Sequence, residues 1–514
     1  MKIKVIDRNN ESYIEVYQNQ TISEALLEKN IFIPNICHGN GTCGKCKIKV
    51  VKGYLPITEA DRRRLAEDEL KQGIRLACKA NLGINSEELW IEIAEEAEED
   101  IDVEGIFQKE ITKEFPQTNQ SHFIIIDIGT TTIAMAMVNI ETGEIIDVYT
   151  SVNHQRRYGA DVITRITAAN AGKSKELKRL IEEDLHKGLA MLTGMGNKII
   201  IAGNTTMIHL LMGYSCESLG KYPFVSEHLG QIQCTLKECI GSFEEYENVP
   251  VTILPGISTF VGGDIVADVL ACEGFETEEV CLLLDLGTNG EMVLGNKHKL
   301  LTTSTAVGPA FEGGNITCGA AAIPGSICQV KIQNQRAVVR TMKNKMPPIG
   351  ICGTGLISAM AQLICNQMVS EDGVLKKPYD EKGISLWTFE NGEKIALYQK
   401  DIREFQMAKA AIRTGIEMLM EEYGCAVSEV KKVYIAGGFG KVFNVEDMIA
   451  TAILPKEFRN KINVIGNGVL QGAALYGKNI KTENNINNIC QRAENIALSQ
   501  NDTFKEKYIE YMKL

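Results

Sequence analysis

The stretch Cys37–Cys46 reads CHGNGTCGKC and gathers three cysteines in one short glycine-rich loop. A fourth cysteine, Cys78, follows in a separate segment. Thiolates are the ligands of iron–sulfur clusters, and glycine lets the backbone lie close to the sulfur atoms. The spacing from Cys37 through Cys43 to Cys46 is one residue longer in its first gap than the plant-type pattern. The four cysteines together therefore predict a 2Fe–2S cluster.

Zinc binding and disulfide formation are the alternative uses of these cysteines. A four-cysteine zinc site normally has two well-separated C-x2-C pairs, but only Cys43 and Cys46 have that spacing here. A disulfide is less favoured still, because nothing in the sequence suggests export. His38 lies inside the loop, and we expect it on the loop surface or against a partner, since four cysteines already suffice for the cluster.

Length and composition indicate a soluble protein of several domains. The chain has 514 residues, 44% of them apolar, and a net charge of −12, which disfavours nucleic acid or an anionic membrane as the main partner. Met1–Asp7 alternates like a strand and lacks the apolar core of a signal peptide, and no apolar run approaches the length of a membrane span. We therefore expect a cytoplasmic protein, in which most of the 15 cysteines are small buried side chains in a reducing compartment.

Residues 1–93 are expected to form one small module. Its predicted elements are a hairpin, a helix with a capping residue, a strand after the cysteine loop and a closing strand. They cover Lys2–Asp7, Tyr13–Val16, Thr21–Leu27, Cys46–Val51 and Trp90–Ile93. This order resembles the 2Fe–2S ferredoxin fold, an α+β fold of the β-grasp type, and the resemblance covers the whole module.

Residues 94–120 differ in character from the module before them. Glu95–Asp100 is almost entirely acidic, and Phe115–Gln120 is polar and contains a proline. Such a segment buries little and repels itself, so it is predicted to be an acidic flexible tether that lets the first module move. A solvent-exposed helix is the alternative.

A second module opens at residue 121 with an apolar strand that runs into a polar turn. The strand ends at Asp127, the turn contains Gly129 and Thr130–Thr132, and an apolar strand resumes after it. Backbone N–H groups and threonine hydroxyls can hold phosphate oxygens, and a carboxylate at the strand end can position Mg²⁺ or a hydrolytic water. The turn thus predicts a phosphate loop.

The same device recurs in Cys281–Leu294, where a strand runs into Asp285, then Gly287, Thr288 and Asn289, and then a second strand. Two copies at a domain-sized separation predict a duplicated fold, with halves over 121–280 and 281–480. This pattern resembles the α/β actin-like (ribonuclease H-like) ATPase superfamily of acetate and sugar kinases, heat-shock chaperones and actin. The resemblance implies that ATP lies between the two halves.

Four further glycine-rich turns fit this scheme, and for each an ordinary tight turn or helix contact is the alternative. They lie in Lys198–Met207, Ile349–Ile357, Val433–Gly440 and Asn467–Ala474. The third, with its paired Gly437 and Gly438, resembles the adenosine motif of the superfamily, and the fourth resembles its final interdomain helix.

Two more carboxylates are candidates for the ATPase site. Asp161 and Asp264 each lie near glycine in the first half, where either could assist Mg²⁺ or serve as a cap or turn residue. The tail over 481–514 is charged and is expected to be helical.

A ferredoxin joined to an ATPase of this superfamily resembles the reductive activators of corrinoid-dependent enzymes. The resemblance spans both modules. It implies that the protein takes one electron from a low-potential donor onto its 2Fe–2S cluster and passes it to inactive Co(II) on a corrinoid protein. Co(I) is thereby regenerated for methyl transfer. Each ~59 mV of uphill transfer costs about 1.4 kcal/mol, which is why ATP is needed.

The resemblance also implies roles for individual residues. Cys37, Cys43, Cys46 and Cys78 would hold the cluster. Asp127 and Asp285 would act on Mg²⁺ and water as the catalytic pair. The residues expected to contact ATP are Gly129, Thr130, Thr131, Thr132, Gly287, Thr288, Asn289, Gly353, Gly437 and Gly438.

Longer relatives carry an extra domain between ferredoxin and ATPase, which this chain is expected to lack. The family further suggests a homodimer. Rival interpretations are a metabolite kinase with a redox domain, a chaperone-like binding protein, and an activator of radical dehydratases. The last type bridges a 4Fe–4S cluster with cysteines inside the ATPase fold, and Cys318, Cys328 and Cys352 keep it open.

Overall fold

The computed structural model describes most of the chain in two compact units. The described residues are 2–7, 10–17, 20–29, 31, 33, 41, 44, 46–82, 88–93, 122–243, 246–287, 289–343, 346–437, 444–498, 501 and 503–514. One unit contains residues 1–98 and 309–405, and the other contains residues 99–308 and 406–514. The predicted tether over 94–120 lies outside the described residues, so its flexibility stays a prediction.

The first segment of the first unit is built on a five-stranded mixed sheet in the order β2-β1-β5-β3-β4. The strands are β1 (Lys2–Asp7), β2 (Asn10–Glu15), β3 (Lys47–Lys52), β4 (Ile74–Leu76) and β5 (Trp90–Ile93), and the helices are α1 (Ile22–Glu28), α2 (Glu59–Arg64) and α3 (Glu67–Lys71). Ile3, Ile22, Leu26, Ile48 and Ile91 belong to one buried core. The predicted β-grasp fold is confirmed, and α2, α3 and β4 are additions that the sequence pattern did not predict.

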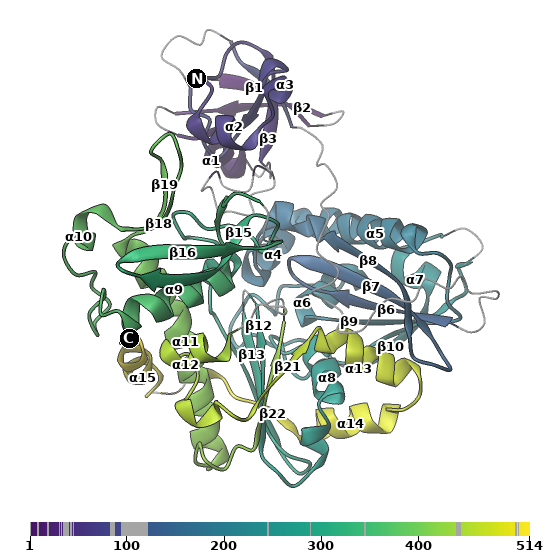
Figure 1. Ribbon diagram of the computed structural model, residues 1–514. Coiled ribbons are helices and arrows are strands. Elements are labelled where there is room, and N and C mark those ends of the chain that lie inside the picture. The colour runs from purple at the N-terminus through teal and green to yellow at the C-terminus, as the bar shows by residue number, and fades with distance from the viewer. Residues whose placement is uncertain are drawn as a thin grey trace. The chain divides into compact units, whose positions relative to one another are not determined.

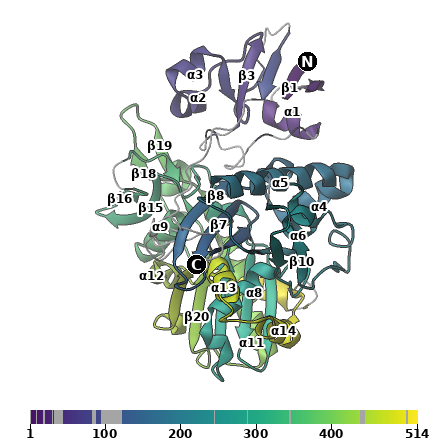
Figure 2. The same cartoon turned by 90° about the vertical axis from the view of Figure 1, so that its right-hand side faces the viewer.

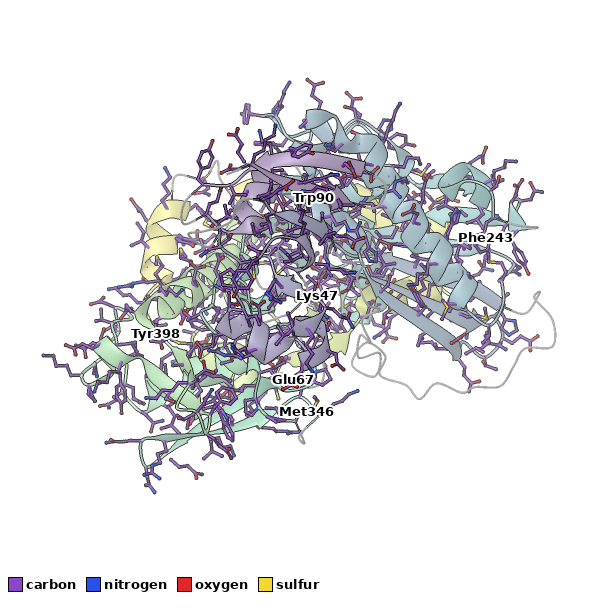
Figure 3. All side chains as sticks on the ribbon, turned by 90° about the horizontal axis from the view of Figure 1, so that it is seen from above. Lys47, Glu67, Trp90, Phe243, Met346 and Tyr398 are labelled. Carbon is purple, nitrogen blue, oxygen red and sulfur yellow. The ribbon has the colours of Figure 1, made fainter. Side chains whose placement is uncertain are left out.

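The side chain of Trp90 on β5 contacts residues of the two neighbouring strands, β1 and β3. Trp90 begins β5 and is labelled in Figure 3. The ammonium groups of Lys4 on β1 and Lys52 on β3 lie 4.4 Å and 4.9 Å from the centre of its ring. Such cation–π contacts favour one register of the neighbouring strands.

The second segment of the first unit contains two small sheets and a buried helix. Its elements are η7 (Pro309–Glu312), β15 (Ser326–Gln333), β16 (Arg336–Thr341), β17 (Gly350–Ile351), α9 (Gly353–Cys365), α10 (Tyr379–Lys382), β18 (Ile384–Thr388) and β19 (Lys394–Leu397). Strands β16-β15-β17 form one sheet and β18-β19 form the other.

The second unit opens with a six-stranded sheet in the order β10-β11-β9-β6-β7-β8 (Figure 1). Its strands are β6 (His122–Ile128), β7 (Thr132–Asn139), β8 (Ile145–Val152), β9 (Ile199–Gly203), β10 (Ile232–Thr235) and β11 (Pro250–Ile253). Ile124 and Ile126 of β6 face a core shared with the helices of one face, whereas Phe123 and Ile125 belong to the core on the other face. A central strand buried on both faces explains the unbroken apolar run before Asp127.

Helices η3 (His154–Tyr158), α4 (Val162–Ala168), η4 (Ala169–Lys173), α5 (Ser174–Met191), α6 (Thr205–Met212) and α7 (Leu236–Ile240) accompany this first sheet. Leu177, Ile181 and Leu185 of α5 lie in its buried core.

A second six-stranded sheet repeats this plan in the order β21-β20-β12-β13-β14-β22. Its strands are β12 (Cys281–Leu286), β13 (Gly290–Gly295), β14 (Leu300–Thr305), β20 (Lys432–Ala436), β21 (Ile462–Gly466) and β22 (Ala493–Asn495). The central strand of each sheet pairs antiparallel with the strand after it and parallel with a later one. The predicted duplication is confirmed.

Two helices lie side by side between the sheets, α8 (Gly263–Ala271) and α13 (Gly468–Gly477) (Figures 1 and 2). A Cβ atom on Gly472 would stand 1.8 Å from the carbonyl oxygen of Ala267, so only glycine permits this crossing. Both helices contribute to the core that also contains Phe123 of β6 and Leu283 of β12. The predicted close-packed last helix of the ATPase is therefore found at α13.

The other elements of this part of the chain are helical. They are η6 (Glu273–Glu276), α11 (Gln399–Tyr423), α12 (Val445–Ala450), η9 (Lys456–Phe458), α14 (Glu483–Arg492) and α15 (Phe504–Tyr511). Helix α11 packs on β13, where Gly415 approaches Met292. Among the described residues, no helix is both long and apolar enough to cross a membrane.

Candidate functional site

Asp127 and Asp285 occupy equivalent places in the two six-stranded sheets. Each is the last residue but one of the central strand, β6 or β12. Asp127 is paired in register with Ala202 of β9, and Asp285 with Ala436 of β20. The two residues predicted as a catalytic pair thus lie at the same end of the central strand in each half.

Burial and mutual repulsion raise the pKa of both carboxyl groups. The pKa of Asp127 rises to about 7, chiefly because the group is desolvated and further because Asp264 is nearby. The pKa of Asp285 also rises to about 7, first through desolvation and then through the charges of Asp264 and Asp127. Carboxyl groups that titrate near neutrality can exchange protons with water at the pH of the cell.

Asp264, the second residue of α8, joins these two carboxylates. Desolvation raises its pKa to about 6, against the opposing effect of the backbone N–H groups around it. The sequence left Asp264 and Asp161 each as either an aid to Mg²⁺ or a cap or turn residue. In the structure, Asp264 lies near the other carboxylates. Asp161 caps α4, where its carboxylate accepts from the Thr164 N–H over 2.8 Å.

Two further acidic residues of the cluster were missed by the sequence analysis. Asp268 is fully buried on α8, and its two carboxylate oxygens have no hydrogen-bond partner among the described residues. Glu291 is buried on β13, opposite Asp285 in register. Desolvation, followed by the other carboxylates, raises the pKa of each well above its ordinary value. An acidic residue in the middle of an otherwise apolar helix was the available signal for Asp268.

Asn467 holds Asp127 in place from the other half of the duplicated fold. Its Nδ2 donates to Asp127 Oδ2 over 2.9 Å, and its Oδ1 accepts from Leu470 N over 2.8 Å, which caps α13. This hydrogen bond lowers the pKa of Asp127 and so opposes the effect of burial. The sequence analysis placed Asn467 at the start of a helix, without this role.

The first predicted phosphate loop, Gly129–Thr132, is a tight turn whose backbone carbonyl groups accept hydrogen bonds from residues outside it. The Gly129 N–H donates to the Thr132 carbonyl over 3.0 Å. Asn153 donates from its side chain to the Gly129 carbonyl (2.9 Å) and from its backbone to the Thr131 carbonyl (2.9 Å). Buried Arg165 donates to the Thr130 carbonyl over 2.5 Å. Asn153 and Arg165, which the sequence analysis did not select, therefore fix the loop in one conformation.

The second predicted loop is described in part. The Gly287 N–H donates to the Asn289 carbonyl over 2.9 Å, whereas Thr288 lies outside the described residues. Gly437 has φ +97°, and a Cβ atom there would stand 2.6 Å from Asp285 Oδ1. Its backbone therefore lies directly against the carboxylate. Gly438 also falls outside the described residues.

Two of the other predicted glycine-rich turns each lead into a helix. Asn204 caps α6 through its side chain, which accepts from Thr206 N. Gly353 is the first residue of α9, and a Cβ atom on it would stand 1.9 Å from the Phe311 carbonyl oxygen. That close approach explains the glycine, and a contact of Gly353 with ATP stays a prediction.

Two of the four predicted cluster ligands are described. Cys46 and Cys78 are both buried, and the Ala77 N–H donates to the Cys46 carbonyl over 2.8 Å, which brings their segments together. Gly41 and Gly44 adopt φ +73° and +74°, conformations that suit a loop wrapped around a cluster. Cys37, His38 and Cys43 lie outside the described residues. The part that is described fits the chemistry of an iron–sulfur ligand set.

Two of the three cysteines that kept a dehydratase activator open, Cys328 and Cys352, make hydrogen bonds within the fold. Cys352 Sγ donates to the Ile327 carbonyl over 3.2 Å, and Cys328 Sγ donates to the Arg340 carbonyl over 3.4 Å. Burial raises the pKa of Cys318, Cys328 and Cys352, which disfavours the thiolate that a cluster needs.

The carboxylate cluster offers hard oxygen ligands, which suit Mg²⁺. Among the residues that the structure covers, no three acidic, histidine or cysteine side chains converge tightly enough to hold a metal ion by themselves. Mg²⁺ is usually bound through one or two carboxylates, several waters and the phosphates of a nucleotide. Asp127 and Asp285 fit that mode of binding.

Three family models match consecutive parts of the chain. A 2Fe–2S iron–sulfur cluster binding domain matches residues 5–82, the RACo middle region matches 123–276, and the C-terminal ASKHA domain of RACo matches 279–514. In the solved structures, a reductive activator for corrinoid, iron–sulfur protein is 26% identical with a TM-score of 0.68, and the match covers 100% of this chain and 98% of that one. Whether this chain lacks a domain that longer relatives carry between the ferredoxin and the ATPase stays a prediction.

Two curated relatives are similar over most of their length. The corrinoid activation enzyme RamQ of Eubacterium limosum is 31% identical over 75% of this chain and 69% of that protein. The [Co(II) methylated amine-specific corrinoid protein] reductase of Methanosarcina barkeri is 25% identical over 75% of this chain and 76% of that protein. With its ferredoxin domain and its RACo middle and C-terminal ASKHA regions, the chain belongs to the RACo family of corrinoid activators.

Proposed function

We propose that this protein is an ATP-hydrolysing reductive activator, which passes one electron to the inactive Co(II) form of a corrinoid protein and so restores Co(I) for methyl transfer. The observation that carries the proposal is the acidic cluster built from both halves of the ATPase fold, in the same chain as a ferredoxin domain. The names of the two curated relatives and of the solved activator support the corrinoid as the acceptor.

The ferredoxin module and the ATPase would have separate roles. A 2Fe–2S cluster held by Cys37, Cys43, Cys46 and Cys78 would supply the one-electron carrier. In the ATPase, Asp127 and Asp285 would bind Mg²⁺ and orient the attacking water, and the loops at Gly129–Thr132 and Gly287–Asn289 would hold the phosphates. Asn467 would keep Asp127 ionised and in position, because its amide stabilises the carboxylate form.

ATP is required in this scheme because the electron transfer is uphill. Each ~59 mV costs about 1.4 kcal/mol for one electron. A nucleotide can supply this energy only if its bound or hydrolysed states differ in affinity for the two redox states of the partner. Asn467 and Asp127 join the two halves of the ATPase at this site. Such a site suits the coupling, because closure on the nucleotide would change the position of one half relative to the other.

We further propose Mg²⁺ as the metal bound with ATP, a low-potential electron donor, a cytoplasmic location and a homodimer. Mg²⁺ rests on the oxygen ligands that the carboxylate groups offer. The location rests on the lack of an apolar span in the sequence, and the electron donor and the homodimer rest on the resemblance to the family.

The experiment is anaerobic visible spectroscopy of a corrinoid protein poised as Co(II) and mixed with this protein, a strong reductant and Mg²⁺. Co(I) is expected only when both ATP and this protein are present. ATP turnover with steady phosphorylation of a sugar or acid, and no Co(I) with any corrinoid protein of the host, would contradict the proposal and favour a kinase.

A further inference from the structure

The loop over 213–230, between α6 and β10, presents aromatic side chains that no role described so far explains. At its tip, Lys221–Val225, the side chains of Tyr222, Phe224 and Val225 are 75%, 43% and 52% exposed. Tyr222 and Phe224 meet edge to face at 6.1 Å, and Phe224 lies 6.1 Å from the ring of Phe260. Exposed apolar groups gathered in this way are typical of a protein-binding surface.

A buried histidine holds the base of the loop rigid. His209 on α6 is 1% exposed, and its two ring nitrogens contact the Ser215 carbonyl and the Ser226 hydroxyl, each at 2.9 Å. The rings of Tyr214 and His228 stack at 3.9 Å beside it. Because both ends are clamped, the tip is presented in one conformation, and little entropy is lost when a partner binds to it.

A polar hollow is lined by other residues of the same loop and by His209. Its volume is about 230 Å³, and its lining includes His209, His228, Glu217 and Glu227. Glu217 pairs with Lys221 of the tip at 2.5 Å, while Glu227 is exposed on the same hollow. The apolar tip, together with the exposed carboxylate of Glu227, complements a partner surface with an apolar patch and a neighbouring lysine or arginine.

The tip is hydrogen-bonded to the segment that leads into the carboxylate cluster. Buried Thr259 donates from Oγ1 to the Phe224 carbonyl over 2.5 Å. Nearer the base, Gly256 N donates to the Leu229 carbonyl over 2.8 Å. The same segment runs into α8, of which Asp264 is the second residue. A movement of Asp264 could therefore reach the exposed tip through the backbone from Asp264 to Thr259 and the hydrogen bond from Thr259 to Phe224.

Phe224 is placed in an unusual backbone conformation by these contacts. Its φ of +58° lies in the left-handed region, which a bulky residue rarely adopts. The bond from Thr259 and a bond from Phe224 N to the Lys221 carbonyl (2.7 Å) hold it there. Strain of this kind is commonly found where a side chain must be aimed at a ligand.

We propose that the tip Lys221–Val225 and the hollow that contains Glu227 form the docking surface for the corrinoid protein, and that Thr259 couples docking to the Asp264 end of the ATP site. The inference rests on the proposed function and adds to it the surface that recognises the partner. The occupant is a protein with an apolar patch flanked by a basic side chain, because the apolar tip and the exposed carboxylate of Glu227 complement such a surface.

The test uses the full chain with its cluster, in the Co(II) reduction assay, at varied concentrations of the corrinoid protein. Tyr222→Asp and Val225→Asp are expected to raise the half-saturating partner concentration at least tenfold and to leave ATP turnover without partner unchanged. Ile480→Asp, which changes another exposed apolar side chain (56% exposed), is the matched control and should change neither.

Thr259→Val tests the coupling, since it keeps the shape of the side chain and removes its hydroxyl donor. Partner binding, measured by sedimentation, should persist, whereas the rise in ATP turnover on adding the partner should fall at least fivefold. An equal response to the partner in wild type and in Thr259→Val would overturn the coupling.

The assay separates failure of this inference from failure of the proposed function. If wild type produces no Co(I), the proposed function fails and the inference falls with it. If wild type is active and the half-saturating concentration is unchanged in Tyr222→Asp and Val225→Asp, the docking surface alone is refuted. It is also refuted if these variants lose only self-association or binding to anionic lipid vesicles, because the tip then serves a second copy or a membrane.

Discussion

Asn467 Nδ2 donates to Asp127 Oδ2 over 2.9 Å, although the two residues are 340 positions apart in the chain. The bond joins the start of the last helix of one half, α13, to the central strand of the other half. It is also the contact that opposes the effect of burial on the pKa of Asp127, which is about 7. The ionisation of Asp127, for which we propose a catalytic role, therefore depends on a contact between the two halves.

Asn467→Asp should shift the acidic limb of the pH profile of ATP turnover to higher pH. The new carboxylate keeps the acceptor that caps α13 but replaces the amide donor with a like charge, so the pKa of Asp127 rises further. Loss of a hydrogen bond to a charged group corresponds to roughly one pKa unit. Turnover should thus fall about tenfold at pH 6.5 and recover near pH 8.5.

Asn463→Asp is the matched control for this pH profile, because Asn463 is an exposed residue of the neighbouring strand β21. It makes the same chemical change away from the cluster. A profile that is the same in wild type and Asn467→Asp would show that Asp127 does not titrate in the rate-limiting step.

Asp127→Asn and Asp285→Asn should each lower ATP turnover about 100-fold or more, because a preorganised charged group is removed from the reacting atoms. The visible spectrum of the cluster should be unchanged, since the cysteines lie in the other unit. Asp161→Asn provides the comparison: it only weakens the cap of α4, so it should cost about 1 kcal/mol of unfolding free energy at most and little turnover. ATP turnover near the wild-type value in Asp285→Asn would show that Asp285 has no catalytic role.

The repeated Asp-x-Gly-Thr turn was sufficient to predict a duplicated fold, because an apolar strand followed by a polar turn is visible within a few residues. The cysteine spacing predicted the ferredoxin module for the same reason. Asn467 and Arg165 could not be found in this way, because their partners, Asp127 and Thr130, are distant in sequence. Asp161 and Asp264 look alike in sequence, and only the fold shows that one caps a helix and the other joins the cluster.

Cys46→Ser and Cys78→Ser should each lower the iron and sulfide content from two of each per chain, and abolish Co(I) formation. ATP turnover without partner should persist, because the ATPase is folded around its own cores. Cys365→Ser, at an exposed cysteine, is the control and should retain the cluster. Full iron content in both Cys46→Ser and Cys78→Ser would contradict the ligand assignment.

Gly472→Ala tests the helix crossing between the two sheets. The added Cβ would stand 1.8 Å from the Ala267 carbonyl oxygen, so α8 and α13 must separate. Overpacking of this kind costs about 1–3 kcal/mol, which thermal unfolding followed by circular dichroism should detect. Gly230→Ala adds the same methyl group where no atom lies within 4 Å, and should leave the melting temperature nearly unchanged. Equal melting temperatures for the two variants would contradict this packing.

The central claim is that ATP drives one electron from this protein to Co(II). The most direct measurement is a single turnover: the protein is reduced, freed of excess reductant, and mixed anaerobically with a Co(II) corrinoid protein, with and without Mg²⁺-ATP. Visible absorption reports Co(I), and electron paramagnetic resonance reports the reduced cluster. We expect one Co(I) for each cluster oxidised, and only with ATP. Co(I) at the same yield without ATP, or ATP hydrolysis with the cluster left reduced, would contradict the claim.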